Sequence, residues 1–255
     1  MNIYYMVKVS IIIPSYNRFK YLLNTINSVK KQTFTDYEII VVNDCSTEQD
    51  YYLHNWKANN INIIHLKENT RKIFGFPCVG YVINQGIKIM KGEYFSTCDD
   101  DDIWLPKKLE LQLVAMQKSG CKMSSTDGFV GKGIYHDKIK YKKYNGEYYF
   151  KLLQDKYKKK GKNELANGFP DIWDLNFLQI HNCMIACSVM IHKDIIQKIG
   201  NQLEIKMGGA VINNKAVHID YDYWLRALKH TKSVYVKEPC FYYDTDHGAG
   251  QEWKK

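Results

Sequence analysis

Residues 7–18 read VKVSIIIPSYNR, an apolar run followed by a proline and by polar side chains. An unbroken apolar run of this kind is typical of a strand that is buried on both faces of a parallel sheet. Pro14 has no backbone N–H to donate to a sheet, so we expect the strand to end there. The stretch therefore predicts a central strand whose carboxyl end carries the polar residues 15–18.

The residues that follow alternate between strand and helix patterns. Apolar runs at 37–44, 60–66 and 92–102 predict three more strands, and apolar residues at helical spacing predict helices at 19–32 and 78–91. This βαβ alternation favours an α/β fold with an open, mostly parallel, twisted sheet flanked by helices.

The second half of the chain continues the pattern without an internal repeat or an interdomain linker. We expect a helix opened by a proline at 104–120, a strand at 121–130, and a strand followed by a helix at 183–200. A further helix is expected at 220–230 and a late strand at 233–243. We therefore expect a single domain over residues 1–255.

Polar side chains gather where three of the predicted strands end. SYNR at 15–18, NDCST at 43–47 and DDDD at 99–102 follow the first, second and fourth strands. Because ligands bind beyond the carboxyl ends of parallel strands, we expect the three segments to border one crevice. No glycine-rich dinucleotide or phosphate-loop motif follows the first strand, so neither of those folds is indicated.

The four consecutive aspartates at 99–102 need a compensating charge. At about 6 Å and an effective dielectric constant of about 20, neighbouring carboxylates repel by about 3 kcal/mol. A solvated loop would tolerate this repulsion, but the run lies between an expected core strand and Trp104. A divalent cation would relieve it, and carboxylate oxygens are ligands that Mg²⁺ or Mn²⁺ prefers.

Composition restricts the class of protein. The 255 residues carry a formal net charge of +9, which favours anionic partners. Seven cysteines without a CxxC pair predict buried, reduced thiols in a cytoplasmic protein. We expect a soluble protein, because no run reaches the ~18 apolar residues of a membrane span and the first residues lack a signal-peptide pattern.

Segment 138–162 is rich in lysine and tyrosine. Its simplest interpretation is a solvated helix and loop. The alternative is an electrostatic guide for an anionic substrate, or a peripheral contact with a membrane surface.

Five segments occur together in the order and spacing of a known family, and the chain resembles the family-2 glycosyltransferases with the GT-A fold. The segments are VSIIIPSYNR, EIIVVNDCSTEQD, NQGIKIMKGEYFSTCDDDDIWLP, SVMIHKDIIQKIG and IDYDYWLRAL. The resemblance implies a Rossmann-like nucleotide-sugar-binding half at 7–105 and an acceptor-binding half at 106–255.

The resemblance also implies an activity. It is metal-dependent, inverting transfer of a hexosyl or N-acetylhexosaminyl group from a nucleoside-diphosphate sugar, most often a UDP-sugar. The acceptor would be a hydroxyl group of a glycan, a protein or a lipid-linked carrier, and the cofactor would be Mn²⁺ or Mg²⁺.

Residues that match the family's motifs acquire expected roles in donor binding. Pro14 and Tyr16 would pack against the base, with Asn17 and Arg18 following them, and Asp44 would bind the uracil edge.

A second group of matching residues would serve the sugar, the diphosphate and the metal. Asn84 belongs to a helix motif of the donor site, Asp99 would face the ribose with Asp100 in support, and Asp101 would ligate the metal. Strand alternation would put Asp99 and Asp101 on one face. His247 matches a histidine that touches the metal or the diphosphate in some members.

Asp220 matches the family's catalytic base, with Asp222 as the fallback; Asp220 as a plain helix N-cap is the alternative. The sequence departs from the family pattern at four positions: Asn43 replaces an aspartate, Cys45 a glycine, Ile83 an arginine and Ile219 a glutamate.

Three other functions stay open at this point. A sugar nucleotidyltransferase also uses an α/β sheet and metal-binding carboxylates, but residues 15–21 lack the glycines of its loop. A nucleic-acid binder would fit the net charge, although aspartates at the strand ends argue against it, and we expect no nucleic acid partner. The four departures keep a non-catalytic sugar-nucleotide-binding module as the third alternative.

Overall fold

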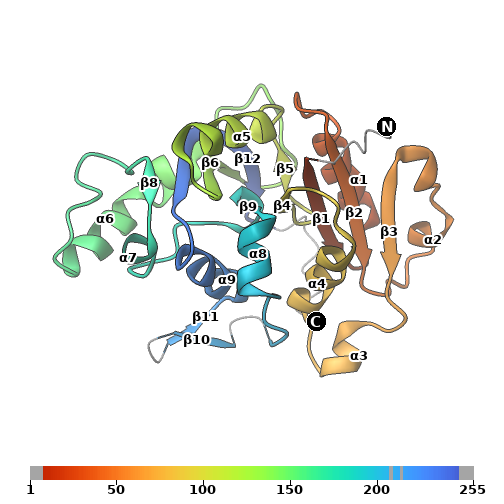
Figure 1. Ribbon diagram of the computed structural model, residues 1–255. Helices are drawn as coiled ribbons and strands as arrows, with labels where there is room; N and C mark the ends of the chain where they lie inside the picture. The colour runs from red at the N-terminus through yellow and green to blue at the C-terminus, as the bar shows by residue number, and fades with distance from the viewer. Residues whose placement is uncertain (1–7, 207–208, 213–214, 247–255) are drawn as a thin grey trace, which may run out of the picture.

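The computed structural model describes residues 8–206, 209–212 and 215–246, and within these ranges the chain folds around one ten-stranded sheet (Figure 1). The strands of this sheet are β1 (Val9–Ser15), β2 (Tyr37–Asn43), β3 (Ile61–His65), β4 (Tyr94–Thr97), β5 (Ile103–Trp104), β6 (Met123–Gly131), β7 (Lys142–Lys143), β8 (Ile172–Trp173), β9 (Met190–His192) and β12 (Ser233–Asp244). A separate two-stranded sheet pairs β10 (Ala210–Ile212) with β11 (Lys215–Val217).

Helices and single turns connect these strands. The α-helices are α1 (Phe19–Val29), α2 (Asp50–Leu53), α3 (Thr70–Phe74), α4 (Val79–Ile89), α5 (Lys108–Ser119), α6 (Phe150–Lys159), α7 (Leu175–Leu178), α8 (Lys193–Ile199) and α9 (Ile219–Leu228). The shorter turns are η1 (Lys57–Asn59), the π-helical η2 (Tyr144–Tyr148) and η3 (Ala186–Ser188).

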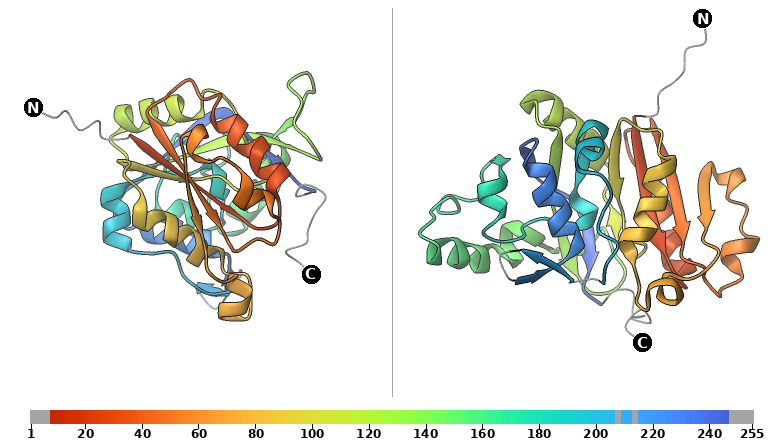
Figure 2. Two further views of the ribbon diagram at one scale, coloured as in Figure 1. Left: turned by 90° about the vertical axis from the view of Figure 1, so that its right-hand side faces the viewer. Right: turned by 60° about the horizontal axis from the view of Figure 1, so that its bottom comes forward.

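The first half of the sheet is parallel, in the order β3-β2-β1-β4. Its central strand is buried on both faces, as the apolar run predicts: Ile12 belongs to one hydrophobic core, and Ile11 and Ile13 to the other. α1 and α5 cover the face of Ile11, while α4, α8 and α9 cover the face of Ile12. Figure 2 shows α1 and α4 on opposite sides of these strands.

α4 lies close against β1 because Gly86 has no side chain. A Cβ atom at this position would lie 2.7 Å from Cγ2 of Ile12, which is too short for a real contact. The glycine of the NQG motif therefore sets the distance between this helix and the sheet.

Pro14 does not end the first strand, which contradicts our expectation. β1 continues to Ser15 and stays paired with β2. Ile12 accepts a hydrogen bond from the N–H of Cys98 on the β4 side, so the missing N–H of Pro14, two residues on, faces the same side. Because β4 ends at Thr97, the proline costs no ladder hydrogen bond, and β1 and β4 separate at this point.

The second half of the sheet is mixed rather than parallel. β9 lies antiparallel between β4 and β6, and the long strand β12 then pairs with β6 in parallel. The strand expected at the start of 183–200 is confined to three residues, because η3 interrupts the backbone just before it. The predicted α/β class is confirmed; the sheet is parallel in its first half, and its second half combines the parallel β6–β12 pair with antiparallel strands.

The structure also shows which cysteine and tryptophan side chains are buried. All seven cysteines are free, and five of them are buried. Trp173 is fully buried in the core and is therefore not available to stack on a sugar. In the described ranges, none of the helices has the length and hydropathy that crossing a bilayer requires.

Candidate active site

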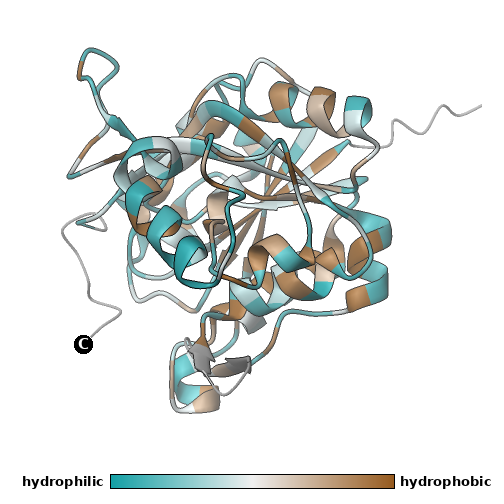
Figure 3. Cartoon of the chain, turned by 90° about the vertical axis from the view of Figure 1, so that its left-hand side faces the viewer, coloured by the Kyte–Doolittle hydropathy of each residue, from teal (hydrophilic) through white to brown (hydrophobic). Residues whose placement is uncertain are grey.

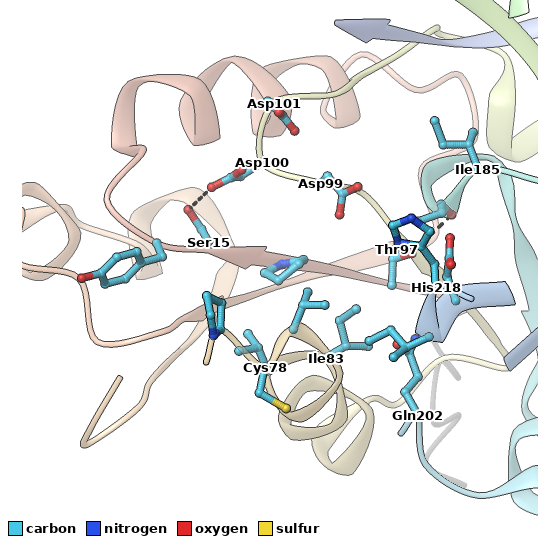
Figure 4. Close-up of a pocket in the computed structure, with 18 of the residues that line it drawn as sticks. Ser15, Cys78, Ile83, Thr97, Asp99, Asp100, Asp101, Ile185, Gln202 and His218 are labelled. Atoms are coloured by element: carbon cyan, nitrogen blue, oxygen red, sulfur yellow. Dashed lines mark hydrogen bonds between the residues drawn. The ribbon is translucent and has the colours of Figure 1, made fainter. Parts of the chain in front are cut away.

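A cavity of about 500 Å³ opens where β1 and β4 separate (Figure 4). This volume is within the range of small-molecule sites. The first half of the chain contributes Tyr16, Arg18, Asp44 and the acidic residues 99–101, and the second half contributes Asp220 among others. The cavity thus brings together the polar segments that the sequence assigns to one crevice.

The aspartates 99–102 form a turn after β4 instead of extending the strand. The argument from strand alternation was therefore wrong, because residues in a turn do not alternate between two faces. Asp99, Asp100 and Asp101 nevertheless all line the cavity, and Asp102 is buried at 1% exposure beside them.

Arg18 supplies the positive charge that the acidic turn requires. Its Nη1 lies 3.1 Å from Oδ1 of Asp100, and its Nη2 lies 2.8 Å from Oδ2 of Asp101. Burial alone would lower the pKa of Arg18, but the charges of these two aspartates outweigh it and raise that pKa. We had expected a divalent cation in this role, so the sequence reasoning missed the internal counter-ion.

Asp100 is also held by a chain of hydroxyl groups that the sequence did not reveal. Ser15 donates from Oγ to Oδ2 of Asp100 at 2.7 Å, the dashed line in Figure 4. The Tyr51 hydroxyl lies 2.5 Å from the same Oγ and accepts the backbone N–H of Arg18 at 3.0 Å. Ser15 stands in the SYNR motif, but Tyr51 lies in α2 and gives no sequence signal of this contact.

Three aspartates of the turn, Asp99, Asp100 and Asp102, have raised pKa values. Burial, followed by repulsion from Asp101, raises the pKa of Asp99 to about 7, and burial also raises the pKa of Asp100 to about 7 despite the opposing charge of Arg18. Burial raises the pKa of Asp102 well above its usual value, and its Oδ2 has no hydrogen-bond partner among the described residues. Without a further cation, it is therefore unfavourable for all four carboxyl groups of the turn to be ionised.

These raised pKa values predict how the stability of the metal-free chain depends on pH. In the unfolded chain the carboxyls titrate near pH ~4, so between about pH 4 and 7 the folded chain retains protons that the unfolded chain releases. The free energy of unfolding should therefore fall as pH rises through this window. We expect the Asp99→Asn variant to lose less stability than the wild type between pH 5 and 8, by about 2 kcal/mol.

Urea unfolding in EDTA at both pH values measures this difference. Asp171→Asn is the matched control, because its side chain is 76% exposed and lies outside the cavity lining. Equal pH dependence in all three proteins would contradict the prediction.

Tyr16 and Asp44 also line the cavity. Tyr16 is 36% exposed and lines the cavity, so it is not a core residue. Asp44 accepts hydrogen bonds from the backbone N–H (2.8 Å) and the hydroxyl (2.6 Å) of Thr70 at the start of α3. Burial raises the pKa of Asp44, and the hydrogen bonds from Thr70 oppose this rise.

Asn17 and Asn84 lie outside the cavity lining and hold other segments in place. Oδ1 of Asn17 accepts from the N–H of Thr47 at 2.7 Å, which joins the loop after β1 to the loop after β2. The fully buried amide of Asn84 exchanges two hydrogen bonds of 3.0 Å with the backbone of Gln202. Both residues thus shape the walls of the cavity.

Cys45 takes the backbone conformation that the family's glycine would take, with a φ of 55°. A left-handed conformation destabilises a residue with a side chain by about 1–2 kcal/mol. Glycine avoids this strain, but its larger conformational entropy in the unfolded chain offsets part of the gain. We therefore expect Cys45→Gly to increase the free energy of unfolding by about 0.5–1 kcal/mol.

Urea unfolding of Cys45→Gly against the wild type measures this change. Asn60→Gly is the matched control, because Asn60 has a φ of 53° and asparagine tolerates this region; its stability should change less. A destabilised Cys45→Gly would contradict the explanation.

Asp220 lies in the first turn of α9 and lines the same cavity as the acidic turn. The N-cap position belongs to His218, so the role of a plain N-cap is excluded. Burial raises the pKa of Asp220, and its charge contributes to raising the pKa of Asp99. Asp222, the fallback, pairs with Arg226 at 2.9 Å and does not line the cavity.

The described residues contain no group of three or more His, Cys, Asp or Glu side chains arranged to hold a metal ion by themselves. The carboxylate of Asp99 lines the cavity without a hydrogen bond or ion pair, and Asp101 is close to it through the turn. Such a donor set fits a cation that takes one or two carboxylates and completes its shell with substrate phosphates. His247 lies outside the described residues.

Comparison with known proteins adds three findings. The family model described as Glycosyl transferase family 2 matches residues 10–191. The uncharacterized glycosyltransferase RT0329 of Rickettsia typhi is 32% identical over 94% of this chain and 64% of its own length. WfgD of Escherichia coli, named as a UDP-Glc:alpha-D-GlcNAc-diphosphoundecaprenol beta-1,3-glucosyltransferase, is 30% identical over 53% of this chain and 54% of its own length. The chain therefore spans less than two thirds of these relatives.

Among solved structures, S. aureus TarS 1-349 in complex with UDP-GlcNAc superimposes with a TM-score of 0.63. The match covers 93% of this chain and 58% of that one, at 17% identity. At this identity the likeness shows the fold, and it confirms the predicted GT-A fold.

Proposed function

The chain belongs to glycosyl transferase family 2, and we propose that it is a metal-dependent, inverting glycosyltransferase that uses a UDP-sugar. The observation that carries this proposal is the cavity itself. One space is lined by Asp44, by Asp99, Asp100 and Asp101 of the acidic turn, and by Asp220. In our proposal these residues serve the base, the diphosphate and the acceptor hydroxyl in turn.

The UDP moiety would occupy the end of the cavity near β2. Asp44 uses its two oxygens to accept from Thr70, and each carboxylate oxygen has a second lone pair available for the N–H of uracil. The exposed ring of Tyr16, next to Pro14, offers a face for the base. Asp99 would then accept from the ribose hydroxyls, because its carboxylate has no hydrogen bond or ion pair with any other described residue.

A diphosphate in this cavity requires positive charge. Among the described residues that line it, Arg18 is the only lysine or arginine, and its charge is already shared by Asp100 and Asp101. Mn²⁺ or Mg²⁺ held by Asp101 would act as a Lewis acid for the leaving diphosphate when bound. We propose that the guanidinium of Arg18 then moves toward the phosphates. Arg18 would thereby take the role of the family's arginine, whose position is occupied by Ile83 in this chain.

Asp220 would remove the proton from the acceptor hydroxyl. Its raised pKa suits a general base that works near neutral pH. In this proposal the acceptor hydroxyl held by Asp220 would attack from the side opposite the leaving group. A single displacement of this kind inverts the anomeric carbon.

The two halves of the chain would divide the work as the sequence suggests. Residues 7–105 supply the proposed donor contacts, and residues 106–255 supply Asp220 and the walls of the acceptor end, including Tyr144 and Asn182. The free cysteines fit a reducing compartment, so we place the reaction in the cytoplasm. The name of WfgD makes a lipid-linked glycan one acceptor class to test.

Thermal unfolding with UDP-, GDP- and dTDP-sugars, each with and without Mn²⁺, tests the proposal. A ligand that binds the folded chain raises its melting temperature by mass action. We expect a UDP-sugar to give the largest rise, and only with Mn²⁺, with slow release of UDP. A chain that no nucleotide sugar stabilises under either condition would contradict the proposed function.

A further inference from the structure

Segment 138–162, here termed the basic arm, carries most of the net charge of the molecule. It contains ten lysines, with Glu147 and Asp155 as its only acidic residues, and so has a formal net charge of +8. The whole chain has +9, which leaves the remainder close to neutral. A general bias toward lysine would spread this charge over the chain, so its concentration singles out this segment.

The helix α6 of the basic arm packs on the rest of the molecule through one side. Leu153 and Tyr157 of α6 are buried, and the Tyr157 hydroxyl donates to the carbonyl of Phe177 at 2.6 Å. The other sides of α6 expose lysines, and Figure 3 views the molecule from the side on which α6 lies. In the part of the chain that the structure describes, no carboxylate forms an ion pair with Lys151, Lys156, Lys158, Lys159 or Lys160.

Apolar side chains are exposed among these lysines. Ile139, Tyr148 and Leu152 are 52%, 51% and 46% exposed. Tyr148, Leu152 and Lys156 follow one another at intervals of four, which places Leu152 and Lys156 on one side of α6. A helix that presents lysines together with exposed aromatic and aliphatic residues is typical of a surface that lies on a membrane.

We propose that the basic arm holds this protein on an anionic phospholipid membrane. Lysines near such a surface contribute about 1 kcal/mol each, and the exposed apolar side chains would enter the interface. A polyanion in solution would account for the lysines but gives Ile139 and Leu152 no role, so the membrane fits the whole surface. The arm contains Tyr144, which lines the cavity, so the contact would lie beside the acceptor end.

Sedimentation of the whole chain with lipid vesicles tests the proposal. We expect binding to phosphatidylcholine vesicles with about 30 mol % phosphatidylglycerol, little binding to phosphatidylcholine alone, and release by salt of about 0.5 M. The variant Lys156→Glu/Lys159→Glu/Lys160→Glu should weaken binding about 100-fold. Leu152→Ser should weaken it several-fold at unchanged net charge.

The matched control is Lys57→Glu/Lys88→Glu/Lys118→Glu, which changes the net charge equally at exposed positions outside the arm. We expect this control to lose far less binding. Equal losses in the two triple variants, or an unaffected Leu152→Ser, would overturn the proposal, and so would equal binding to both vesicle types. The melting temperature of each variant, measured with UDP and Mn²⁺, checks that it is folded. Vesicle binding is measured by sedimentation, so the result does not depend on transfer activity.

Discussion

Replacing Asp220 with Asn is expected to lower the rate of sugar transfer by about 10²–10⁴-fold. The amide cannot accept the proton of the acceptor hydroxyl, but its oxygen can still accept the backbone N–H of Tyr221, which lies 2.7 Å from Oδ1 in the native chain. The helix start should therefore be preserved. Initial rates with a saturating UDP-sugar measure the loss, and calorimetry with UDP and Mn²⁺ should give an affinity close to that of the wild type.

Asp222→Asn is the matched control for this experiment. Asp222 lies two residues further along α9, pairs with Arg226 and is absent from the cavity lining. Its replacement should change the rate only a few-fold. Undiminished turnover in Asp220→Asn would exclude Asp220 as the base, and a loss confined to Asp222→Asn would transfer the role to that residue.

Replacing Asp101 with Ala is expected to abolish the contribution of Mn²⁺ to UDP binding. The proposed ligand and its negative charge are both removed, and a Lewis-acid contact worth several kcal/mol corresponds to at least a 100-fold loss of affinity. In EDTA the variant should bind UDP no more weakly than the wild type, because one repulsive charge near the diphosphate has gone. Calorimetry with and without Mn²⁺ measures both affinities.

The comparison between the two conditions is the internal control, and Asp171→Ala provides a second one at an exposed carboxylate far along the chain. Asp101→Ala also removes an ion pair with Arg18, so the melting temperature of the metal-free variant should be recorded. An affinity in Mn²⁺ equal to that of the wild type would refute the assignment of Asp101 as the metal ligand.

Local sequence patterns predicted the first half of the fold well. Each of its strands reads as an apolar run, and the connecting helices carry the chain back so that the strands pair in parallel. The second half was harder because β9 is only three residues long and lies between strands from distant parts of the chain. No local pattern specifies such an insertion, and its antiparallel direction was therefore missed.

The candidate site shows the same division. The sequence located the acidic turn, Asp44 and Asp220 because polar residues directly after buried strands, or at the start of a helix, are conspicuous. It did not identify the partners of these residues. The pairing of Arg18 with Asp100 and Asp101, and the contact of Tyr51 with Ser15, depend on how distant segments meet in space.

The hydroxyl groups of Tyr51 and Ser15 connect α2 to Asp100 of the acidic turn. Tyr51 belongs to α2, which follows the loop after β2, whereas Asp100 belongs to the turn that would receive the cation. Thermodynamic linkage is reciprocal. If this connection makes bound nucleotide change the affinity for the cation, the cation must change the affinity for the nucleotide by the same factor.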